Sequence, residues 1–267
     1  MNIIIGAILG FVQGLSEFLP ISSSGHLNLV QALFHVDIPH QLFFNIMLHV
    51  GTLLAVAIVF WKDWLHMLRH PIKDPTLLLL FVASLPALAG KILFDDQLAY
   101  VETHNTLLGV CFLLTGAFLL ATQRLGQRQL SRHYGSEKVG FGHALCMGVL
   151  QAFGMLPGIS RSGSTIFGGV ASGLTRETAA KFSFMMSAPA IVAGALSEGY
   201  TVMKEGVSIG NSLPAMLVGM VVAAVSGYFA IRFFLKIISK ASLQWFALYM
   251  ALIGLLTIVL QITSVIA

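Results

Sequence analysis

Charged side chains are scarce in this chain of 267 residues. Asp, Glu, Lys and Arg make up 10% of it, whereas soluble globular domains carry about 25%. Hydrophobic residues make up 57%, and the mean hydropathy is +0.86. This composition predicts an integral membrane protein surrounded by membrane lipids. The net charge of +4 therefore indicates basic loops beside a membrane, and we expect no nucleic-acid partner.

Cysteine is scarce as well. Cys111 and Cys146 stand alone in apolar runs, without paired spacing, so we expect neither a disulfide nor a cysteine-bound metal. The N-terminus also lacks a basic region followed by a small-residue cleavage site. We therefore expect no removable signal peptide.

Six apolar segments are long enough to cross a hydrocarbon core, which needs about 20 helical residues. They lie near residues 41–60, 76–94, 106–122, 180–200, 212–231 and 243–265. Two further apolar regions, residues 2–35 and 142–174, are interrupted by proline, glycine and serine. We predict that each folds as a re-entrant helix hairpin, because irregular backbone at membrane depth must be packed in protein or line a wet cavity.

The two interrupted regions look like copies of each other. Five pairs of identical residues are 138 positions apart: Gly10 and Gly148, Gln13 and Gln151, Ser22 and Ser160, Ser24 and Ser162, Gly25 and Gly163. The copies differ in their ionisable groups, since the first carries Glu17 and His26 and the second carries Arg161. This division predicts one composite site rather than two identical ones.

The basic residues predict how the chain crosses the membrane. With three spans per half, twelve of them fall on one side, which is cytoplasmic by the positive-inside rule: Lys62, Arg69, Lys73, Arg124, Arg128, Arg132, Lys138, Arg176, Lys181, Arg232, Lys236 and Lys240. An odd number of spans per half inverts one half relative to the other. We therefore predict an all-α membrane protein made of two inverted repeats, residues 1–138 and 139–267, each with one hairpin and three spans. Such repeats place their site near the midplane, where the halves meet.

Arg161 and Glu17 are the strongest candidates for that site. A cation in a membrane-embedded turn costs about 2.5–3.5 kcal/mol on insertion scales, so Arg161 needs a partner or a ligand. One interpretation is a structural ion pair with Glu17, and the other is an anion clamp, since guanidinium suits phosphate oxygens. Glu17 shares a helical face with Gln13. Its carboxylate is suited to coordinating a divalent cation, accepting a proton or neutralising Arg161.

Hydroxyl groups and amides surround these charges at the start of two short helices. The residues are Ser22, Ser23, Ser24 and Gly25 in the first copy, and Ser160, Ser162 and Thr165 in the second. Helix N-termini bind phosphate, although capping alone would also explain serines there. His26 follows directly and is suited to acid–base chemistry near neutral pH. We interpret Asn45 and His49 as supporting or packing residues.

Two motifs carry a resemblance to a known family. The first reads Gln13-Gly-Leu-Ser-Glu17-Phe-Leu-Pro-Ile-Ser-Ser-Ser-Gly-His26, and the second reads Pro157-Gly-Ile-Ser-Arg161-Ser-Gly-Ser-Thr165. On these residues the chain resembles the bacterial undecaprenyl-diphosphatase family (UppP, also called BacA) over essentially its whole length. The resemblance implies a multi-pass enzyme of the inner membrane that hydrolyses undecaprenyl diphosphate to undecaprenyl phosphate and inorganic phosphate. That reaction recycles the lipid carrier for peptidoglycan synthesis and confers bacitracin resistance.

The resemblance also implies a divalent cation, Mg²⁺ or Ca²⁺, and a site open to the periplasmic face. Gln13 and Glu17 are the candidate metal-binding or supporting residues, and Glu17 is the one carboxylate, because some family members carry Glu where this chain has Gln13. The residues leave several schemes open: Ser23 as nucleophile with His26 as base, direct attack by His26, or attack by water. A polyprenyl-phosphate flippase is the alternative function, because paired broken helices are also transporter features. The sequence leaves the oligomeric state open, a homodimer included.

Overall fold

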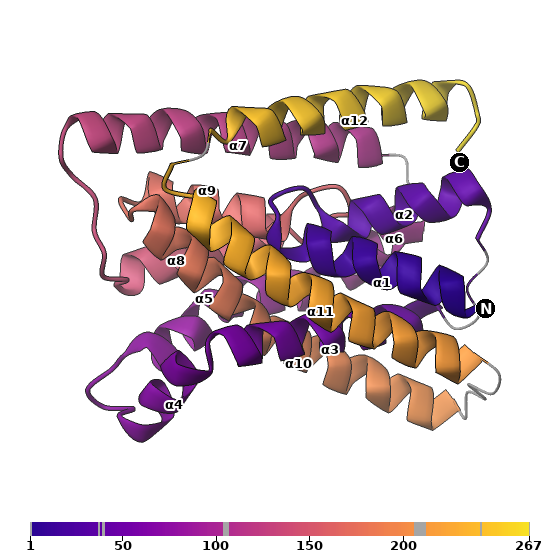
Figure 1. The fold of residues 1–267 in the computed structure, drawn as a ribbon, viewed down its shortest axis with the longest axis horizontal. Helices are drawn as coiled ribbons and strands as arrows, with labels where there is room; N and C mark the ends of the chain where they lie inside the picture. The colour runs from indigo at the N-terminus through magenta and orange to yellow at the C-terminus, as the bar shows by residue number, and fades with distance from the viewer. Residues whose placement is uncertain are drawn as a thin grey trace.

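The computed structural model describes residues 2–36, 38, 41–103, 107–205, 212–240 and 242–266, and this part of the chain is built from helices (Figure 1). The helices are α1 (Ile3–Phe18), α2 (Ser23–Phe34), α3 (Gln41–Val59), α4 (Trp61–Arg69), α5 (Thr76–Leu93), α6 (Asp95–Thr103), α7 (Leu108–Ser131), α8 (Phe141–Phe153), α9 (Arg161–Ala171), α10 (Arg176–Glu205), α11 (Leu213–Ile237) and α12 (Gln244–Ile262).

Six of these helices, α3, α5, α7, α10, α11 and α12, are long and apolar enough to cross a membrane. Each coincides with one predicted span, which confirms an all-α membrane protein. The predicted span 106–122 is too short, however, because α7 continues to Ser131. Its last turns carry charges but also the buried Gln129, whose amide donates to the carbonyls of Val170 and Leu174 at 3.1 Å each. Those tertiary hydrogen bonds stabilise a helical end that hydropathy alone does not mark.

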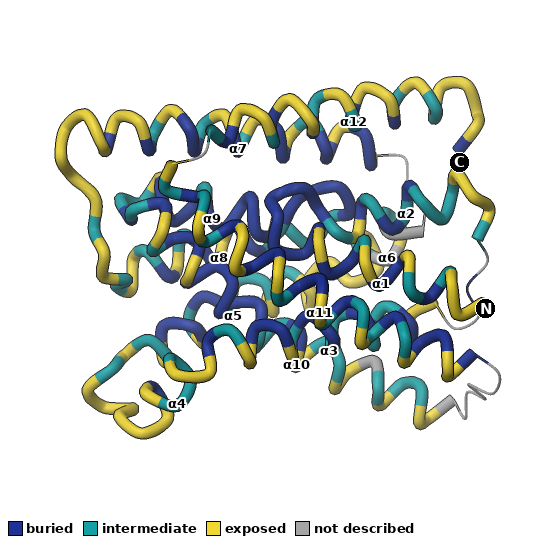
Figure 2. The backbone as a smooth tube through the Cα atoms, viewed as in Figure 1, coloured by how far each residue is buried: buried dark blue, intermediate teal, exposed yellow. Residues whose placement is uncertain are grey.

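The two interrupted regions fold as pairs of short helices, α1 with α2 and α8 with α9. The connection between α1 and α2 contains Pro20, and the connection between α8 and α9 contains Pro157 and Gly158. Gly158 has a φ of +91°, which favours glycine, and an added Cβ would lie 2.7 Å from the carbonyl oxygen of Leu108. Both connections are largely buried in the middle of the molecule (Figure 2). The protein thus surrounds the irregular backbone, as membrane depth requires.

The packing of the helices pairs elements from the two halves of the chain. Helix α1 lies against α11, and its counterpart α8 lies against α5, while α7 lies beside α12 along one face (Figure 1). Close approach of α1 to α11 depends on glycine, since a Cβ on Gly10 would overlap the carbonyl oxygen of Gly219. A duplication would account for this reciprocal packing, and the two inverted repeats with their boundary at residue 138 stay a prediction.

The charged connections lie at opposite ends of the molecule. Helix α4 and the connection from α7 to α8, both rich in Lys and Arg, lie at the end away from the two chain ends (Figure 1). Helix α6, which begins with Asp95 and Asp96, lies toward the end that holds the termini. The short helices α4 and α6 were absent from the predicted elements because they are too short and too polar to read as spans. The distribution agrees with the predicted orientation.

Candidate functional site

The tips of the two hairpins meet, and Glu17 and Arg161 face each other where they do. Glu17 lies in the last turn of α1 and is 6% exposed, and Arg161 begins α9. Nη2 of Arg161 donates to Oε1 of Glu17 at 2.7 Å. A second contact joins the tips, because the hydroxyl of Ser162 donates to the carbonyl of Leu19 at 3.3 Å. The structure thus brings together the carboxylate of the first copy and the guanidinium of the second, as the prediction of one composite site requires.

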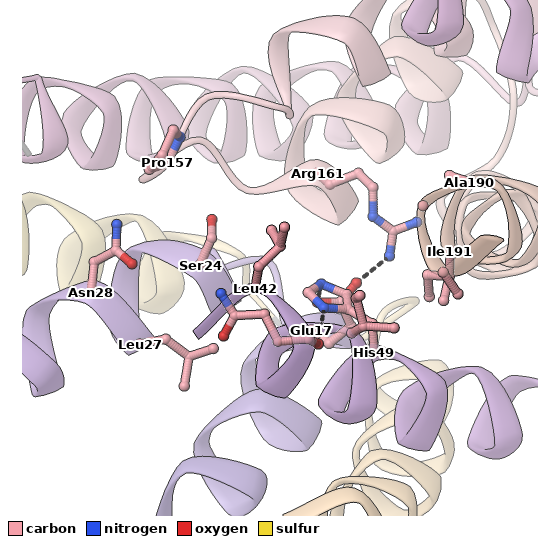
Figure 3. A pocket seen from close by; sticks show the side chains of 14 residues that line it. Glu17, Ser24, Leu27, Asn28, Leu42, His49, Pro157, Arg161, Ala190 and Ile191 are labelled. Atoms are coloured by element: carbon pink, nitrogen blue, oxygen red, sulfur yellow. Dashed lines mark hydrogen bonds and ion pairs between the residues drawn. The ribbon is translucent and has the colours of Figure 1, made fainter. Parts of the chain in front are cut away.

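The second carboxylate oxygen of Glu17 collects the remaining polar groups. Oε2 accepts a hydrogen bond from the hydroxyl of Ser23 at 2.5 Å and another from Nε2 of Gln13 at 2.9 Å. Nε2 of His49 lies 3.9 Å from the same oxygen. Figure 3 shows Arg161 and His49 approaching the carboxylate, each joined to it by a dashed line. The carboxylate of Glu17 is thus surrounded by one guanidinium, one hydroxyl, one amide and one imidazole.

Two serines cap the helices that start at the site. Ser22 accepts from the backbone N–H of Gly25 at 3.3 Å, and Ser160 accepts from that of Gly163 at 3.0 Å. Both are N-caps, so the capping interpretation holds for these two side chains. The caps leave other first-turn N–H groups, with the positive ends of two helix dipoles, near the paired charges. The arrangement favours an anion between the hairpin tips.

Both ring nitrogens of His26 have partners other than Ser23 in this structure, which argues against the predicted serine–histidine pair. Its Nδ1 lies 2.7 Å from the carbonyl oxygen of Ser22, and its Nε2 lies 2.7 Å from the hydroxyl of Tyr249. The ring also stacks on Tyr249 with centroids 5.7 Å apart. Although His26 follows Ser23 by three positions on α2, its two ring nitrogens are taken by the Ser22 carbonyl and by Tyr249 on α12. Glu17 is the acid–base group within hydrogen-bond distance of the Ser23 hydroxyl.

Three other predicted site residues, Gly25, Ser162 and Thr165, are buried next to the site. They are not among the described residues that line the two cavities around Glu17. Thr165 donates to the carbonyl of Arg161 at 2.8 Å and lies 2.6 Å from the hydroxyl of Ser183 on α10. Ser162 spans the hairpin tips, as described above. Gly25 is packed so tightly that a Cβ would lie 2.5 Å from the ring of Phe112. Their observed role is to fix the backbone around Arg161 and the α2 cap.

Two adjoining cavities contain the polar groups. The inner one is about 180 Å³ and is lined by Ser16, Glu17, Ser22, Ser23, Ser24, His49, Gly154, Met155, Ile159, Ser160 and Arg161. The outer one is about 270 Å³, shares Glu17, Ser24, His49 and Arg161 with the inner one, and adds apolar residues of α2, α3 and α10. Figure 3 shows Leu27, Leu42 and Ile191 among these. A small polar chamber with an apolar approach suits an amphiphile with a charged head.

Asn45 and His49 are closer to the site than the sequence indicated, since both line the outer cavity. The signal was present, because positions 42, 45, 46 and 49 lie on one face of α3 and line that cavity together. A histidine and an asparagine on one face of an otherwise apolar span are a reason to expect a polar neighbour. Ser183 and Tyr249 carried no such signal, because their partners lie on distant segments.

A divalent cation, implied by the family resemblance, finds a partial set of ligands here. No group of three or more His, Cys, Asp or Glu side chains in the described ranges is arranged to hold a metal. Mg²⁺, however, commonly uses one or two carboxylates together with substrate phosphates. Glu17 supplies one carboxylate, and Oε1 of the fully buried Gln13 has no hydrogen-bond partner. These residues fit a cation whose coordination the substrate completes.

Comparison with known proteins identifies relatives over nearly the whole chain. The family model described as "Bacitracin resistance protein BacA" matches residues 6–256. Undecaprenyl-diphosphatase of Carboxydothermus hydrogenoformans is 39% identical over 262 residues, which cover 98% of each chain. Undecaprenyl-diphosphatase 3 of Bacillus cereus is 38% identical over 267 residues, covering 99% of this chain and 100% of the relative. A relative from Methanosphaera stadtmanae with the name undecaprenyl-diphosphatase is 34% identical over 283 residues, covering 98% of this chain and 99% of that one. The chain therefore belongs to the bacitracin resistance protein BacA family.

Proposed function

We propose that this membrane protein hydrolyses undecaprenyl diphosphate to undecaprenyl phosphate and inorganic phosphate. The observation that carries the proposal is the array in which Glu17 bonds the Ser23 hydroxyl through one oxygen and Arg161 through the other. The array combines a candidate nucleophile, a proton acceptor and a phosphate-binding cation at one point. Family membership and the names of the relatives support the same substrate. The reaction would recycle the lipid carrier of peptidoglycan synthesis and confer bacitracin resistance.

The proposed first step is attack by Ser23 on the terminal phosphorus. A bond forms between Oγ of Ser23 and phosphorus, the bridging P–O bond breaks, and undecaprenyl phosphate leaves with the electron pair. Glu17 takes the hydroxyl proton, because its Oε2 already accepts that hydrogen bond at 2.5 Å. Water then attacks the phosphoserine and releases inorganic phosphate. Direct attack by water, with Glu17 as its base, is the competing scheme.

Arg161 holds and stabilises the transferred phosphoryl group in this mechanism. Its side chain is 18% exposed, so it borders the cavity while remaining largely out of solvent. Phosphoryl transfer depends mainly on positioning and on stabilising charge in the transition state, and a guanidinium in a water-poor chamber serves both. The first-turn amides of α2 and α9 add fixed dipoles of the same sign. A divalent cation held by Glu17 and Gln13 would, when bound, neutralise charge on the diphosphate oxygens.

The cavity opening supports hydrolysis on the outer face of the inner membrane. The outer cavity is lined by the first half of α3 and by Ala190, Ile191, Gly194 and Ala195 in the second half of α10. In Figure 1 these parts of the two helices lie toward the end that holds the chain termini. The basic connections lie at the other end, which the positive-inside rule assigns to the cytoplasm. The diphosphate would therefore enter from the periplasmic side, with its chain in the lipid.

The proposal is tested with purified protein in detergent and in liposomes. We expect release of inorganic phosphate from undecaprenyl diphosphate, dependent on Mg²⁺ or Ca²⁺, and none from lipid incubated with the Arg161→Ala variant. Folded wild-type protein that releases no phosphate would contradict the proposal. A parallel assay of lipid translocation in liposomes would then test the flippase alternative, which requires neither a nucleophile nor a proton acceptor.

A further inference from the structure

Arg176 is a buried cation at the cytoplasmic end of the molecule, separate from the site around Glu17. It is the first residue of α10 and is 6% exposed. Its Nη2 donates to the backbone carbonyl of Gln123 at 2.8 Å and to Oε1 of the same residue at 3.1 Å. Its Nε is buried and has no hydrogen-bond partner among the described residues. The oxygens that the guanidinium binds are thus neutral ones of α7.

The charge of Arg176 has no counter-ion at contact distance in the described part of the chain. None of the ion pairs there includes Arg176, and the neighbouring Glu177 is exposed to solvent. A buried charge is normally paired, because removal from water costs free energy that an opposite charge offsets. Arg176 therefore differs from Arg161, which is paired with Glu17.

The start of α10 adds to the positive potential around this guanidinium. A helix N-terminus carries the positive end of the helix dipole, where a cation is unfavourable and an anion is favourable. The hydroxyl of Thr175 accepts from the backbone N–H of Thr178 at 3.3 Å. The N–H groups of Arg176 and Glu177, in the same first turn, have no partner within the helix. A buried guanidinium and free helix amides therefore lie together.

A cavity of about 320 Å³ lies at this helix start, and Arg176 lines it. Its other polar lining includes the hydroxyls of Tyr134, Thr175 and Ser239 and the carboxylate of Glu177. Gly126 of α7 makes room for the guanidinium, because an added Cβ would overlap Nε of Arg176. The cavity is larger than one phosphate group and is rich in hydrogen-bond donors.

The cavity lies where the membrane meets the cytoplasm. The last turns of α7 are at the end of the molecule away from the chain termini (Figure 1), which the positive-inside rule assigns to the cytoplasm. Leu130 and Tyr134 line the cavity and are themselves exposed. An exposed leucine beside an exposed tyrosine is typical of the membrane–water interface. Basic pockets between membrane helices on the cytoplasmic side bind the headgroups of anionic lipids.

We propose that this cavity, the Arg176 pocket, binds a phosphate group at the cytoplasmic surface, as the headgroup of an anionic phospholipid or as inorganic phosphate. Arg176 and the first-turn amides of α10 hold its oxygens. The bound phosphate connects the end of α7, the start of α10 and the connection that contains Ser239. The inference goes beyond the proposed hydrolysis and does not depend on it, because Arg176 is not among the residues that line the two cavities around Glu17.

A purely structural role for Arg176 is the rival explanation. In that case the side chain ties α10 to α7 through Gln123 and needs no anion. Both explanations predict that the protein loses stability when Arg176 is replaced. They differ in whether phosphate binds there, since a ligand that binds the folded state raises stability with its concentration.

The experiment compares wild type, Arg176→Gln and Arg128→Gln as full-length protein in detergent. Arg128 is the matched control, because it is an exposed arginine in the last turn of α7 and is not part of the pocket lining. One arm follows the unfolding temperature as inorganic phosphate replaces chloride at constant ionic strength. The other arm uses native mass spectrometry to compare binding of phosphatidylglycerol with that of a diacylglycerol of the same chains.

We expect Arg176→Gln to weaken binding of phosphate or phosphatidylglycerol at least about tenfold, and Arg128→Gln to weaken it less than about twofold. Phosphate bound beside Arg161 contributes equally to all three proteins and cancels in the comparison. Binding of phosphatidylglycerol alone identifies the ligand as a lipid headgroup, and binding of inorganic phosphate alone identifies it as the free ion. Either result supports the proposal.

A second variant keeps the test decisive if Arg176→Gln fails to fold. Ser239→Asp places a carboxylate on the pocket lining, where it pairs with the guanidinium in place of phosphate. We expect this variant to unfold at a higher temperature than wild type without phosphate and to gain less from added phosphate. The inference is overturned if neither ligand binds the wild type, if Arg176→Gln binds as tightly as Arg128→Gln, or if Ser239→Asp responds to phosphate as the wild type does.

Discussion

Arg161 and Glu17 are 144 positions apart in the chain, yet their side chains form a 2.7 Å ion pair where the two hairpin tips meet. The carboxylate side chain is 5% exposed and the guanidinium side chain 18%. Each hairpin therefore buries a charge whose ion-pair partner lies in the other hairpin. Neither hairpin holds a complete site. The site therefore forms only when the two halves of the chain pack together.

The ion pair predicts a non-additive effect on stability. Removing one member of a buried pair leaves the other charge unpaired, which costs about 3–5 kcal/mol. We expect Arg161→Ala to lower the free energy of unfolding by an amount in this range, and the Glu17→Gln/Arg161→Ala double variant to be more stable than Arg161→Ala alone. Unfolding in mixed detergent micelles, followed by circular dichroism, measures the difference. Simple addition of the two single effects would show that the pair is not coupled.

Substitutions of His26 and Tyr249 should lower activity less than a substitution of Glu17. The histidine bonds the tyrosine hydroxyl and stacks on its ring, and neither contact reaches Ser23. We expect His26→Gln to lose less activity than Glu17→Gln, and Tyr249→Phe to lose less still because the ring stack is retained. Steady-state phosphate release from a polyprenyl diphosphate checks the order. A His26→Gln variant as inactive as Glu17→Gln would restore histidine as the base or the nucleophile.

The contact of α1 with α11 predicts sensitivity to a single methyl group. A Cβ on Gly10 would overlap the carbonyl oxygen of Gly219, whereas a Cβ on Gly142 would meet no atom within 4 Å. Overpacking costs about 1–3 kcal/mol, so Gly10→Ala should lower the unfolding temperature. Gly142→Ala is the matched control and should leave that temperature unchanged or raise it slightly. Equal temperatures for the two variants would mean that α1 shifts freely on α11.

The orientation is testable by labelling single cysteines in a variant without Cys111 and Cys146. Ile72 is 97% exposed in the basic connection after α4, and Asp95 is exposed at the start of α6. We expect a membrane-impermeant maleimide added to spheroplasts to label Asp95→Cys but to label Ile72→Cys only after lysis. Labelling of Ile72→Cys in intact spheroplasts would reverse the orientation and the proposed periplasmic opening.

Hydropathy and repetition predicted the architecture well, because both are read directly from the order of residues and need no knowledge of tertiary contacts. The six spans, the two interrupted hairpins and the meeting of Glu17 with Arg161 all followed from apolar length and from the matched motifs. The bounds of α7 did not, since its last turns depend on hydrogen bonds from Gln129 to residues more than 40 positions away. Buried amides of this kind are invisible to a hydropathy window.

Side-chain directions within the site were the other limit. Sequence proximity suggested His26 as the partner of Ser23, but a tertiary contact places Nε2 of the imidazole 2.7 Å from the hydroxyl of Tyr249 on α12. His49 was interpreted as a supporting or packing residue because its segment indicates a polar neighbour without identifying that neighbour as Glu17. Tertiary placement of α3 brings it to 3.9 Å. Motif spacing identifies which residues belong to a site, whereas the contacts between helices decide which pairs touch.

The most direct test of the account is the rate of phosphate release from undecaprenyl diphosphate by Ser23→Ala and Glu17→Gln. A serine in α5, Ser84, donates to the Leu80 carbonyl of its own helix at 2.8 Å, and Ser84→Ala serves as the matched control. Loss of a general base costs about 10²–10⁴-fold in rate, so Glu17→Gln should fall by at least that much, Ser23→Ala by as much or more, and Ser84→Ala not at all. If folded Ser23→Ala and Glu17→Gln kept more than about a tenth of the wild-type rate, a barrier change under about 1.4 kcal/mol, the paired hydroxyl and carboxylate would not be the centre of catalysis.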